Sequence, residues 1–334
     1  MNRRKTHSEC GRLPCRGHVW NRRALVCAAA VLCALSGSWY LARGQSAPAA
    51  ERADVDAKRA FGYLLKVCRL GPRPSGSRAM AEQQKLIADH FVGFGANVSF
   101  QTFDAAHPLS GMPVRMSNIV VSWHPDAMER VLIACHYDTL PFPDRDPVNP
   151  RGVFLGANDG ASGVALLMEL GHHMAGLDPA YGVDFVFFDG EEFLFGDSGR
   201  FFLGSEHFSQ EYAAHSPGHR YVAGVLVDMV GDRNLAIYQE KNSVKLAPGV
   251  TRSVWDAARR TNAKEFIPRV RHEIMDDHLA LNNIAKIPTC DVIDFDFPHW
   301  HTTRDIPAQC SGASLATVGR VLLEWLERPN LDGQ

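Results

Sequence analysis

The sequence predicts one three-layer α/β domain, in which a mixed, mostly parallel central sheet is flanked by helices. Three observations lead to this fold class. Segments whose apolar residues recur at helical spacing alternate with short strand-like runs. Several of these runs are apolar on both faces, which is typical of parallel strands covered by helices on both sides. No internal repeat or linker interrupts residues 51–334, so we expect a single domain there.

The first half of the domain begins with two predicted helices, at residues 53–68 and 79–94, and Gly95 ends the second one. Strand-like runs follow at residues 97–103, 117–123 and 130–135. A long loop rich in Pro, Asp and Arg then occupies residues 140–156. Loops of this length in a compact domain usually serve a function or form a rim.

The second half continues the alternation. Helical spacing is present at residues 163–174, 199–208 and 314–326, and strand-like runs are present at residues 183–188, 221–230 and 288–293. Residues 295–304 read as a loop. In open sheets of this class, ligands bind beyond the carboxyl ends of the strands. Polar residues at those ends are therefore the candidates for function.

Composition excludes one class of partner. The 334 residues are 46% hydrophobic and 22% charged, with a net charge of -2. The body of the chain has no basic stripe, so we expect no nucleic-acid partner. We expect the domain to be a monomer.

The first 50 residues differ from the rest. Seven Arg or Lys residues lie within the first 23 positions, and an uncharged apolar stretch follows at residues 24–39. Residues 24–42 are about long enough to span a bilayer. We therefore interpret residues 1–50 as a signal peptide or an N-terminal membrane anchor plus a linker. Either reading predicts an exported protein that is periplasmic, secreted or anchored through residues 24–42.

Three residues that follow different strands can supply a zinc site. Zinc in catalytic sites takes three His or carboxylate ligands and keeps one position open. Asp159 lies in a turn of small residues, Glu192 follows the strand at 183–188, and His301 lies in the loop at 295–304. Asp159 alone would also suit a helix N-cap. Because Glu192 and His301 are also candidate ligands, we expect Asp159, Glu192 and His301 to bind the metal together.

Other polar residues near the strand ends suit proton transfer or metal support. Glu191 precedes a metal ligand and has no packing purpose, so we expect it to act as general base and then general acid. Asp138 has the spacing to orient His136. Asp228 ends an apolar run and must be satisfied by a metal or by hydrogen bonds, because burying an unpaired carboxylate is costly.

Two later segments complete the candidate site. Asp276 and Asp277 are adjacent acids, so one of them can hold a raised pKa and share a proton, although a solvated turn with a helix cap would also place them there. Trp300 precedes the candidate ligand His301 and either packs as a rim aromatic or stacks on substrate.

The set resembles the M28 zinc aminopeptidase clan. Its pattern of His-x-Asp, an Asp in a small-residue turn, Glu-Glu, a further Asp and a late His is matched over residues 53–327. Within that clan the chain is similar to the glutaminyl-peptide cyclotransferases, or glutaminyl cyclases. The motifs that carry this similarity are Cys135-His136-Tyr137-Asp138, Asp189-Gly190-Glu191-Glu192, Asp276-Asp277-His278 and Trp300-His301-Thr302.

The resemblance implies a zinc aminopeptidase-like fold and an enzyme that closes the N-terminal glutamine of peptides into pyroglutamate, with release of ammonia. It implies one zinc ion on Asp159, Glu192 and His301, with Glu191 as acid and base. Asp228 and Asp277 would form a carboxylate network near the substrate amine, and Trp300 would line the substrate pocket.

Two departures from the cyclase pattern keep alternatives open. Val164 stands where the animal enzymes have a second cysteine, so their disulfide with the cysteine before His-x-Asp is absent, and the tryptophan expected shortly after Glu-Glu is missing. Because His136 and Asp228 could bind a second zinc, an M28 aminopeptidase with one or two zinc ions is the alternative function. A more remote alternative is an inactive peptide-binding ectodomain, against which the retention of Glu191 and Glu192 counts.

Overall fold

The computed structural model describes residues 54–177, 179–215 and 218–331. The predicted leader, residues 1–50, lies outside the described residues. Within the described ranges, no helix is both long and apolar enough to cross a membrane.

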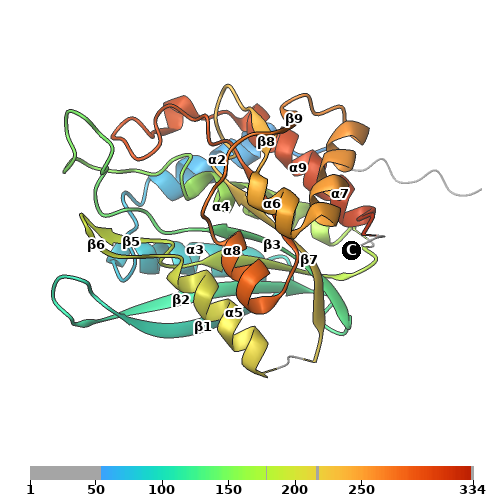
Figure 1. Ribbon diagram of the computed structural model, residues 1–334, viewed down its shortest axis with the longest axis horizontal. Helices are drawn as coiled ribbons and strands as arrows, with labels where there is room; N and C mark the ends of the chain where they lie inside the picture. Colours follow the sequence, from blue (N-terminus) through green and yellow to red (C-terminus); the bar gives the residue numbers. More distant parts are fainter. Residues whose placement is uncertain (1–53, 178, 216–217, 332–334) are drawn as a thin grey trace, which may run out of the picture. The chain divides into compact units, whose positions relative to one another are not determined.

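Six strands form the central sheet in the order β1-β2-β4-β3-β7-β10 (Figure 1). Their bounds are β1 (Asn97–Ala106), β2 (Pro113–Trp123), β3 (Glu129–His136), β4 (Gly182–Phe188), β7 (Arg220–Asp228) and β10 (Thr289–Ile293). Strands β4, β3, β7 and β10 run parallel to one another. The antiparallel hairpin of β1 and β2 adds to β4 through an antiparallel pairing with β2. The predicted mixed, mostly parallel sheet is confirmed.

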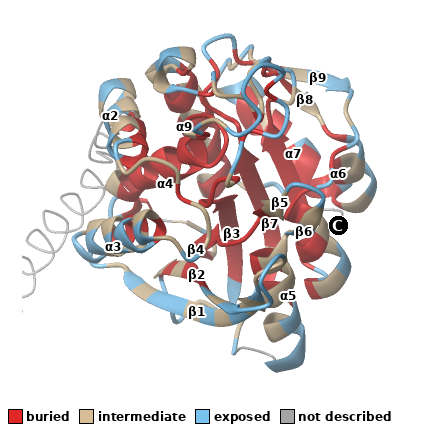
Figure 2. Ribbon diagram, turned by 90° about the vertical axis from the view of Figure 1, so that its left-hand side faces the viewer, coloured by how far each residue is buried: buried red, intermediate tan, exposed pale blue. Residues whose placement is uncertain are grey.

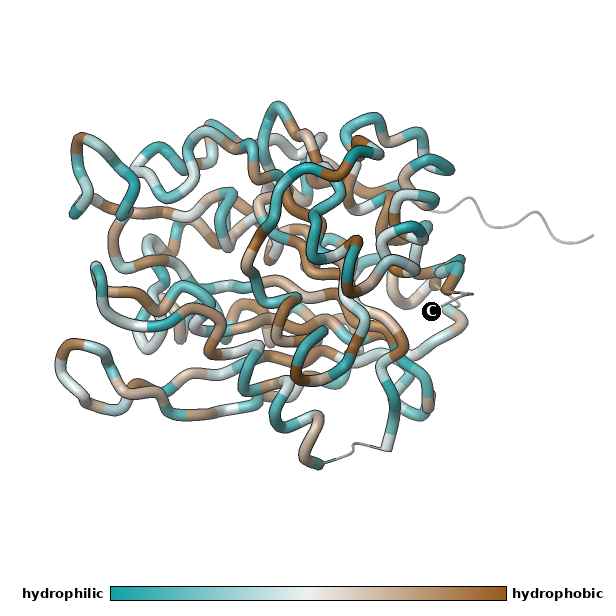
Figure 3. Tube along the Cα trace, viewed as in Figure 1, coloured by the Kyte–Doolittle hydropathy of each residue, from teal (hydrophilic) through white to brown (hydrophobic). Residues whose placement is uncertain are grey.

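Helices pack on both faces of this sheet (Figure 2). One face is covered by α2 (Ala57–Cys68), α3 (Arg78–Val92), α4 (Ala161–Met174), α7 (Pro248–Arg260) and α9 (Gly312–Glu327), and the other by α5 (Leu203–His215) and the π-helical turn η1 (Leu281–Ala285) that continues α8 (His278–Ala280). Side chains of β3 alternate between the two cores: Ile133 belongs to the first and Leu132 to the second. The hydrophobic segments are concentrated in these central strands (Figure 3).

Several short elements surround the sheet. A hairpin of β5 (Glu192–Phe195) and β6 (Ser198–Phe201) follows β4. The parallel pair β8 (Ile237–Gln239) and β9 (Phe266–Val270) is accompanied by α6 (Lys241–Leu246), and the 3-10 turn η2 (Pro307–Gln309) precedes α9.

Two predicted bounds are wrong. The helix predicted at residues 199–208 begins only at Leu203, because residues 198–201 form the second strand of the β5–β6 hairpin. Gly199 has a φ of 112°, which a helix does not allow. The strand predicted at residues 221–230 ends at Asp228, because Met229 turns the chain with a φ of 48°.

Candidate active site

The carboxyl ends of the parallel strands bring the predicted site residues together. His136 ends β3, Asp228 ends β7, and the turn after β4 carries the adjacent acids. A pocket of 280 Å3 opens at this edge of the sheet. The candidate residues that line it are Asp159, Glu191, Glu192, Asp228, Asp276, Trp300 and His301.

Asp159, Glu192 and His301 form a buried set that fits one metal ion. His301 Nε2 lies 2.9 Å from Glu192 Oε1 and 3.6 Å from Asp159 Oδ2. Atoms bound to one tetrahedral zinc lie about 3.3 Å apart, given zinc–ligand bonds of about 2 Å. The buried Asp159 Oδ2 has no hydrogen-bond partner among the described residues, so it is available to a cation. The donor set and its spacing therefore fit zinc.

His136 forms a second set with the opposite oxygen of Asp159. Its Nε2 lies 3.2 Å from Asp159 Oδ1 and 3.1 Å from Asp228 Oδ1. The contact with Asp228 is a hydrogen bond, the contact with Asp159 has the distance of an ion pair, and the three residues also have the spacing of a metal site. Asp159 thus faces both sets, one with each carboxylate oxygen.

Asp138 holds the turn that carries Glu191 and Glu192. Its carboxylate accepts hydrogen bonds from the backbone N–H groups of Glu191 and Glu192, at 3.1 and 3.0 Å. Its Oδ1 is 3.7 Å from His136 Nδ1, which is longer than a hydrogen bond. Asp138 therefore orients the backbone of Glu191 and Glu192 directly, whereas it makes no direct hydrogen bond to the His136 ring.

Two features fix the turn of Asp159. Asp305, which the sequence patterns do not reveal, accepts hydrogen bonds from the backbone N–H groups of Asn158 and Asp159, at 2.8 and 3.0 Å. Gly160 has a φ of 91°, and a Cβ there would lie 2.6 Å from the Asp138 carbonyl oxygen. Gly160 itself is the N-cap position of α4, so the Asp159 side chain is free of capping and points into the site.

Two further residues support the site without having been predicted. Asp144, in the loop after β3, places its Oδ1 2.8 Å from His301 Nδ1 and so orients that ring. Arg73 is fully buried, and its guanidinium donates hydrogen bonds to the carbonyl oxygens of Leu155 and Gly156. Its positive charge lies near the buried acids of the site.

Buried carboxylates crowd the pocket beside the metal set. Burial raises the pKa of Glu191 well above its usual range; His136 opposes the shift, while Glu192 and Asp276 add to it. Burial and the neighbouring Asp228 likewise raise the pKa of Asp276. So many buried acids are costly to ionise together without a compensating cation. A bound metal ion would supply that compensation.

Asp276 and Asp277 occupy different positions. Asp276 lines the pocket, whereas Asp277 does not line it and is fully buried. Burial raises the pKa of Asp277 to about 7. The acid that lines the pocket is therefore Asp276, whereas the resemblance to the glutaminyl cyclases implied a role for its neighbour Asp277.

Aromatic side chains form the pocket walls. The Trp300 ring packs 4.3 Å from the His301 ring and 4.8 Å from that of Phe295. Phe201 and Phe202 also line the pocket, in the segment after Glu191 and Glu192 where the sequence lacks the expected tryptophan. Three pocket residues, Phe202, Met229 and His301, have positive φ angles of 66°, 48° and 57°. Strained non-glycine backbone of this kind concentrates at functional sites.

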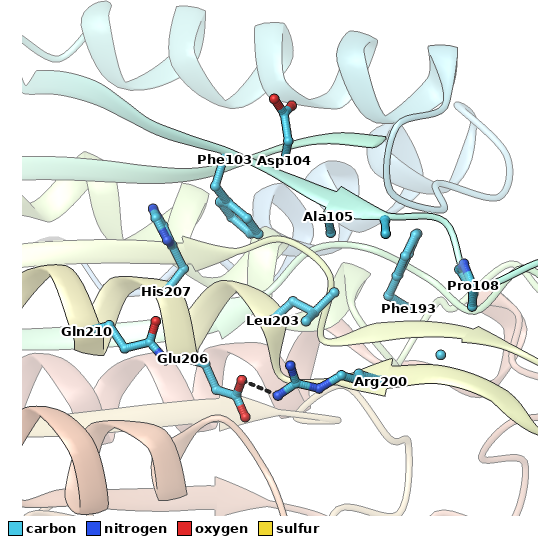
Figure 4. Close-up of a pocket in the computed structure, with 12 residues that line it drawn as sticks. Phe103, Asp104, Ala105, Pro108, Phe193, Arg200, Leu203, Glu206, His207 and Gln210 are labelled. Atoms are coloured by element: carbon cyan, nitrogen blue, oxygen red, sulfur yellow. Dashed lines mark hydrogen bonds and ion pairs between the residues drawn. The ribbon is translucent and has the colours of Figure 1, made fainter. Parts of the chain in front are cut away.

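A separate groove of 490 Å3 lies between β1, β6 and α5 (Figure 4). In this groove Arg200 contacts Glu206, and the His207 ring stacks on Phe103. None of the metal-set residues lines it. The candidate chemistry therefore belongs to the smaller pocket.

Comparison with known proteins agrees with this geometry. The model of peptidase family M28 matches residues 118–326. The glutaminyl-peptide cyclotransferase-like protein of Mus musculus is 27% identical over 305 residues, which cover 81% of this chain and 76% of that protein.

Solved structures give the same fold. The crystal structure of Fimbriiglobus ruber glutaminyl cyclase superposes with a TM-score of 0.81 at 37% identity, covering 85% of this chain and 99% of that one. A leucine aminopeptidase precursor from Bacteroides thetaiotaomicron superposes with a TM-score of 0.78 at 32% identity, covering 83% and 98%. The predicted fold class is confirmed, and the chain belongs to peptidase family M28.

Proposed function

We propose that this chain is a zinc-dependent glutaminyl-peptide cyclotransferase, which closes the N-terminal glutamine of peptides to pyroglutamate and releases ammonia. The observation that carries the proposal is the group of carboxylates Glu191, Asp228 and Asp276, which lines the same pocket as the metal set. Such a group suits a substrate that presents an amine beside the metal. The similarity to glutaminyl cyclases supports the same reading.

Asp159, Glu192 and His301 would hold the zinc, which when bound would act as a Lewis acid on the γ-amide carbonyl of the substrate glutamine. Asp228 and Asp276 would accept hydrogen bonds from the substrate α-amine and orient it toward the amide carbon. The attack is intramolecular, so positioning contributes much of the rate. Trp300 would pack against the side chain of the reacting residue.

Glu191 would move the proton. The α-amine nitrogen forms a bond to the γ-carbonyl carbon, and Glu191 accepts the proton that the amine loses. Glu191 then donates a proton to the amide nitrogen, and the carbon–nitrogen bond breaks to release ammonia. Burial raises the pKa of Glu191 and so favours the protonated form that can donate, while the nearby His136 favours the carboxylate form that can accept a proton. Asp277 would influence this step through its charge, although it does not line the pocket.

The second candidate function is an M28 aminopeptidase, and one observation favours it. His136, Asp159 and Asp228 have the spacing of a second metal site that shares Asp159 with the first. In that case Glu191 would be the base for an attacking water. The similarity to a leucine aminopeptidase precursor agrees with this candidate.

The product distinguishes the two functions. The zinc-loaded domain is incubated with a peptide that begins with glutamine and with a matched peptide that begins with leucine. A cyclotransferase converts the first to its pyroglutamyl form with release of ammonia and leaves the second intact. Release of free leucine or free glutamine would favour the aminopeptidase.

The leader bears on where this reaction would occur. The basic and apolar character of residues 1–50 supports an exported enzyme that meets peptide or protein N-termini outside the cytoplasm. Attachment through residues 24–42 is the membrane-anchored form of this proposal. We also propose that the domain works as a monomer.

A further inference from the structure

Arg145 is an exposed residue that lines the pocket, and its backbone contacts His301 of the metal set. Its backbone N–H donates a hydrogen bond to the His301 carbonyl oxygen, at 3.2 Å. The preceding residue, Asp144, contacts the His301 ring. The Arg145 guanidinium carbon lies 4.0 Å from the centroid of the Trp300 ring. The exposed arginine is therefore stacked beside the substrate pocket.

The charge of Arg145 is unusual for its position. Among the described residues that line the pocket, it is the one Lys or Arg, and the others include acids at Asp159, Glu191, Asp228 and Asp276. The described part of the chain places no carboxylate within 4.0 Å of its guanidinium, whereas the neighbouring exposed acid Glu273 contacts Lys241. The adjacent Asp144 carboxylate feels the charge of Arg145 but contacts the His301 ring, so Arg145 offers a cation without a direct ion-pair partner at the entrance of an acidic pocket.

The chemistry of a stacked guanidinium identifies the ligand. The guanidinium lies over the Trp300 ring and makes no hydrogen bond to a described residue, so its N–H donors are available to a ligand. Those donors match a carboxylate, which can accept two parallel hydrogen bonds. If the buried acids hold the α-amine of the first substrate residue, the rest of the peptide must leave through the mouth, past Trp300 and Arg145.

We propose that Arg145 is a specificity-determining residue that binds a carboxylate on the residue following the N-terminal glutamine. This inference rests on the proposed function, since it uses the orientation of the substrate in that reaction. The carboxylate can be the side chain of Asp or Glu at the second position, or the C-terminus of a dipeptide. Without Arg145, the acids of the pocket would repel either group.

The test compares substrates that differ by one charge. The peptides are Gln-Glu-Ala-Phe-amide and Gln-Gln-Ala-Phe-amide, and the dipeptides are Gln-Ala and Gln-Ala-amide. For the zinc-loaded wild-type protein, we expect kcat/KM to favour the carboxylate in at least one pair, by about 5-fold at low salt. High salt should reduce this preference. The pair that responds identifies the source of the carboxylate.

Two variants of Arg145 complete the test. Arg145→Met should abolish or reverse the preference in the responding pair, while Arg145→Lys should keep part of it, because the charge remains and the planar fork is lost. An unchanged preference in Arg145→Met, or no preference in either wild-type pair, would overturn the inference.

The role of Arg145 can still be tested if the protein is an aminopeptidase and not a cyclotransferase. In that case the wild-type protein would release leucine from Leu-Gln-Ala-Phe-amide without cyclising any glutamine peptide. The same preference is then measured as cleavage of Leu-Glu-Ala-Phe-amide against Leu-Gln-Ala-Phe-amide. Loss of the acidic preference in Arg145→Met would support the role of Arg145, and its persistence would refute it.

Discussion

Glu191 lines the pocket that also holds the metal set, where we propose that it moves the proton. Its neighbour Glu192 points its Oε1 to His301, so the proposed mechanism gives the two adjacent carboxylates separate tasks. The division follows from the turn after β4, which Asp138 fixes through both backbone N–H groups. In the proposed mechanism, Glu192 binds the metal and the adjacent Glu191 transfers the proton.

The variant Glu191→Gln tests this division. It keeps the side-chain shape and removes the proton acceptor, so kcat should fall by about 100- to 10,000-fold. Zinc content, measured by elemental analysis, should stay at the wild-type value. His301→Ala is the contrasting variant and should lose zinc together with activity. Full activity in Glu191→Gln would refute the proposed mechanism.

Asp144 should affect the metal site through His301. Removal of its carboxylate in Asp144→Ala frees the ring that Oδ1 now contacts at 2.8 Å. Zinc affinity should then weaken by about 10- to 100-fold in a chelator competition assay. Asp144→Asn keeps an acceptor oxygen and should weaken binding less. Equal zinc affinity in all three proteins would show that Asp144 does not orient the ligand.

The sequence located the residues that end strands, and it missed those that act across the fold. Asp159, Glu192 and His301 could be predicted because each follows an apolar run or lies in a turn of small residues. Asp144 and Asp305 could not, because their partners His301 and Asp159 are 157 and 146 positions away. No local pattern marks such a pair.

At the scale of elements, the loop that carries Asp276 is anchored to α6. Glu240 caps this helix by accepting hydrogen bonds from the backbone N–H groups of Asn242 and Ser243, and it also accepts one from Ile274, at 3.0 Å. The Glu240 carboxylate therefore binds both the start of α6 and the loop that carries Asp276. Burial raises the pKa of Glu240, but the His278 imidazole, 3.3 Å away, and hydrogen bonds from these N–H groups lower it to about 2.

This linkage predicts a pH-dependent loss of stability in Glu240→Gln. The folded pKa of about 2 lies below the ordinary value of 4.5. The carboxylate therefore stabilises the fold fully above pH 4.5, and the contribution is lost as the pH falls toward 2. At neutral pH the variant should lose about 2 kcal/mol of unfolding free energy. Urea unfolding at both ends of this range measures the difference.

Glu273→Gln is the matched control for that experiment. Glu273 lies in the same loop, and its side chain is 66% exposed in a pair with Lys241. Its replacement should change the unfolding free energy by less than about 1 kcal/mol at either pH. If Glu240→Gln behaved like Glu273→Gln, the anchoring role of Glu240 would be refuted.

The sequence predicted the sheet and the helices around it better than the elements that shape the pocket. Strongly apolar runs such as β4 and β7 follow a simple pattern, and they were found. Most of β6 was predicted as the start of the helix at residues 199–208, because its apolar residues also fit helical spacing. The segment between β7 and β10, including α7, gave no firm expectation. Its contacts are set by tertiary packing against the sheet and α9.

At the scale of the whole molecule, the fold concentrates buried acid at one edge of the sheet. Strands β3, β4, β7 and β10 end there, and each delivers a carboxylate or imidazole directly or through the loop that follows. The arrangement is costly without a cation, and one zinc ion on Asp159, Glu192 and His301 would relieve it. The remaining carboxylates would then be free to bind an amine and move its proton.

In the proposed reaction the attacking group is the amine of the substrate itself and not water. Mass spectrometry of the product from a Gln-Ala-Phe-amide peptide, turned over by the zinc-loaded protein in water enriched in heavy oxygen, tests this. A cyclotransferase gives a product that has lost one ammonia and contains no heavy oxygen. Free glutamine carrying heavy oxygen in its new carboxylate would contradict the proposed reaction and show that the protein hydrolyses the peptide bond.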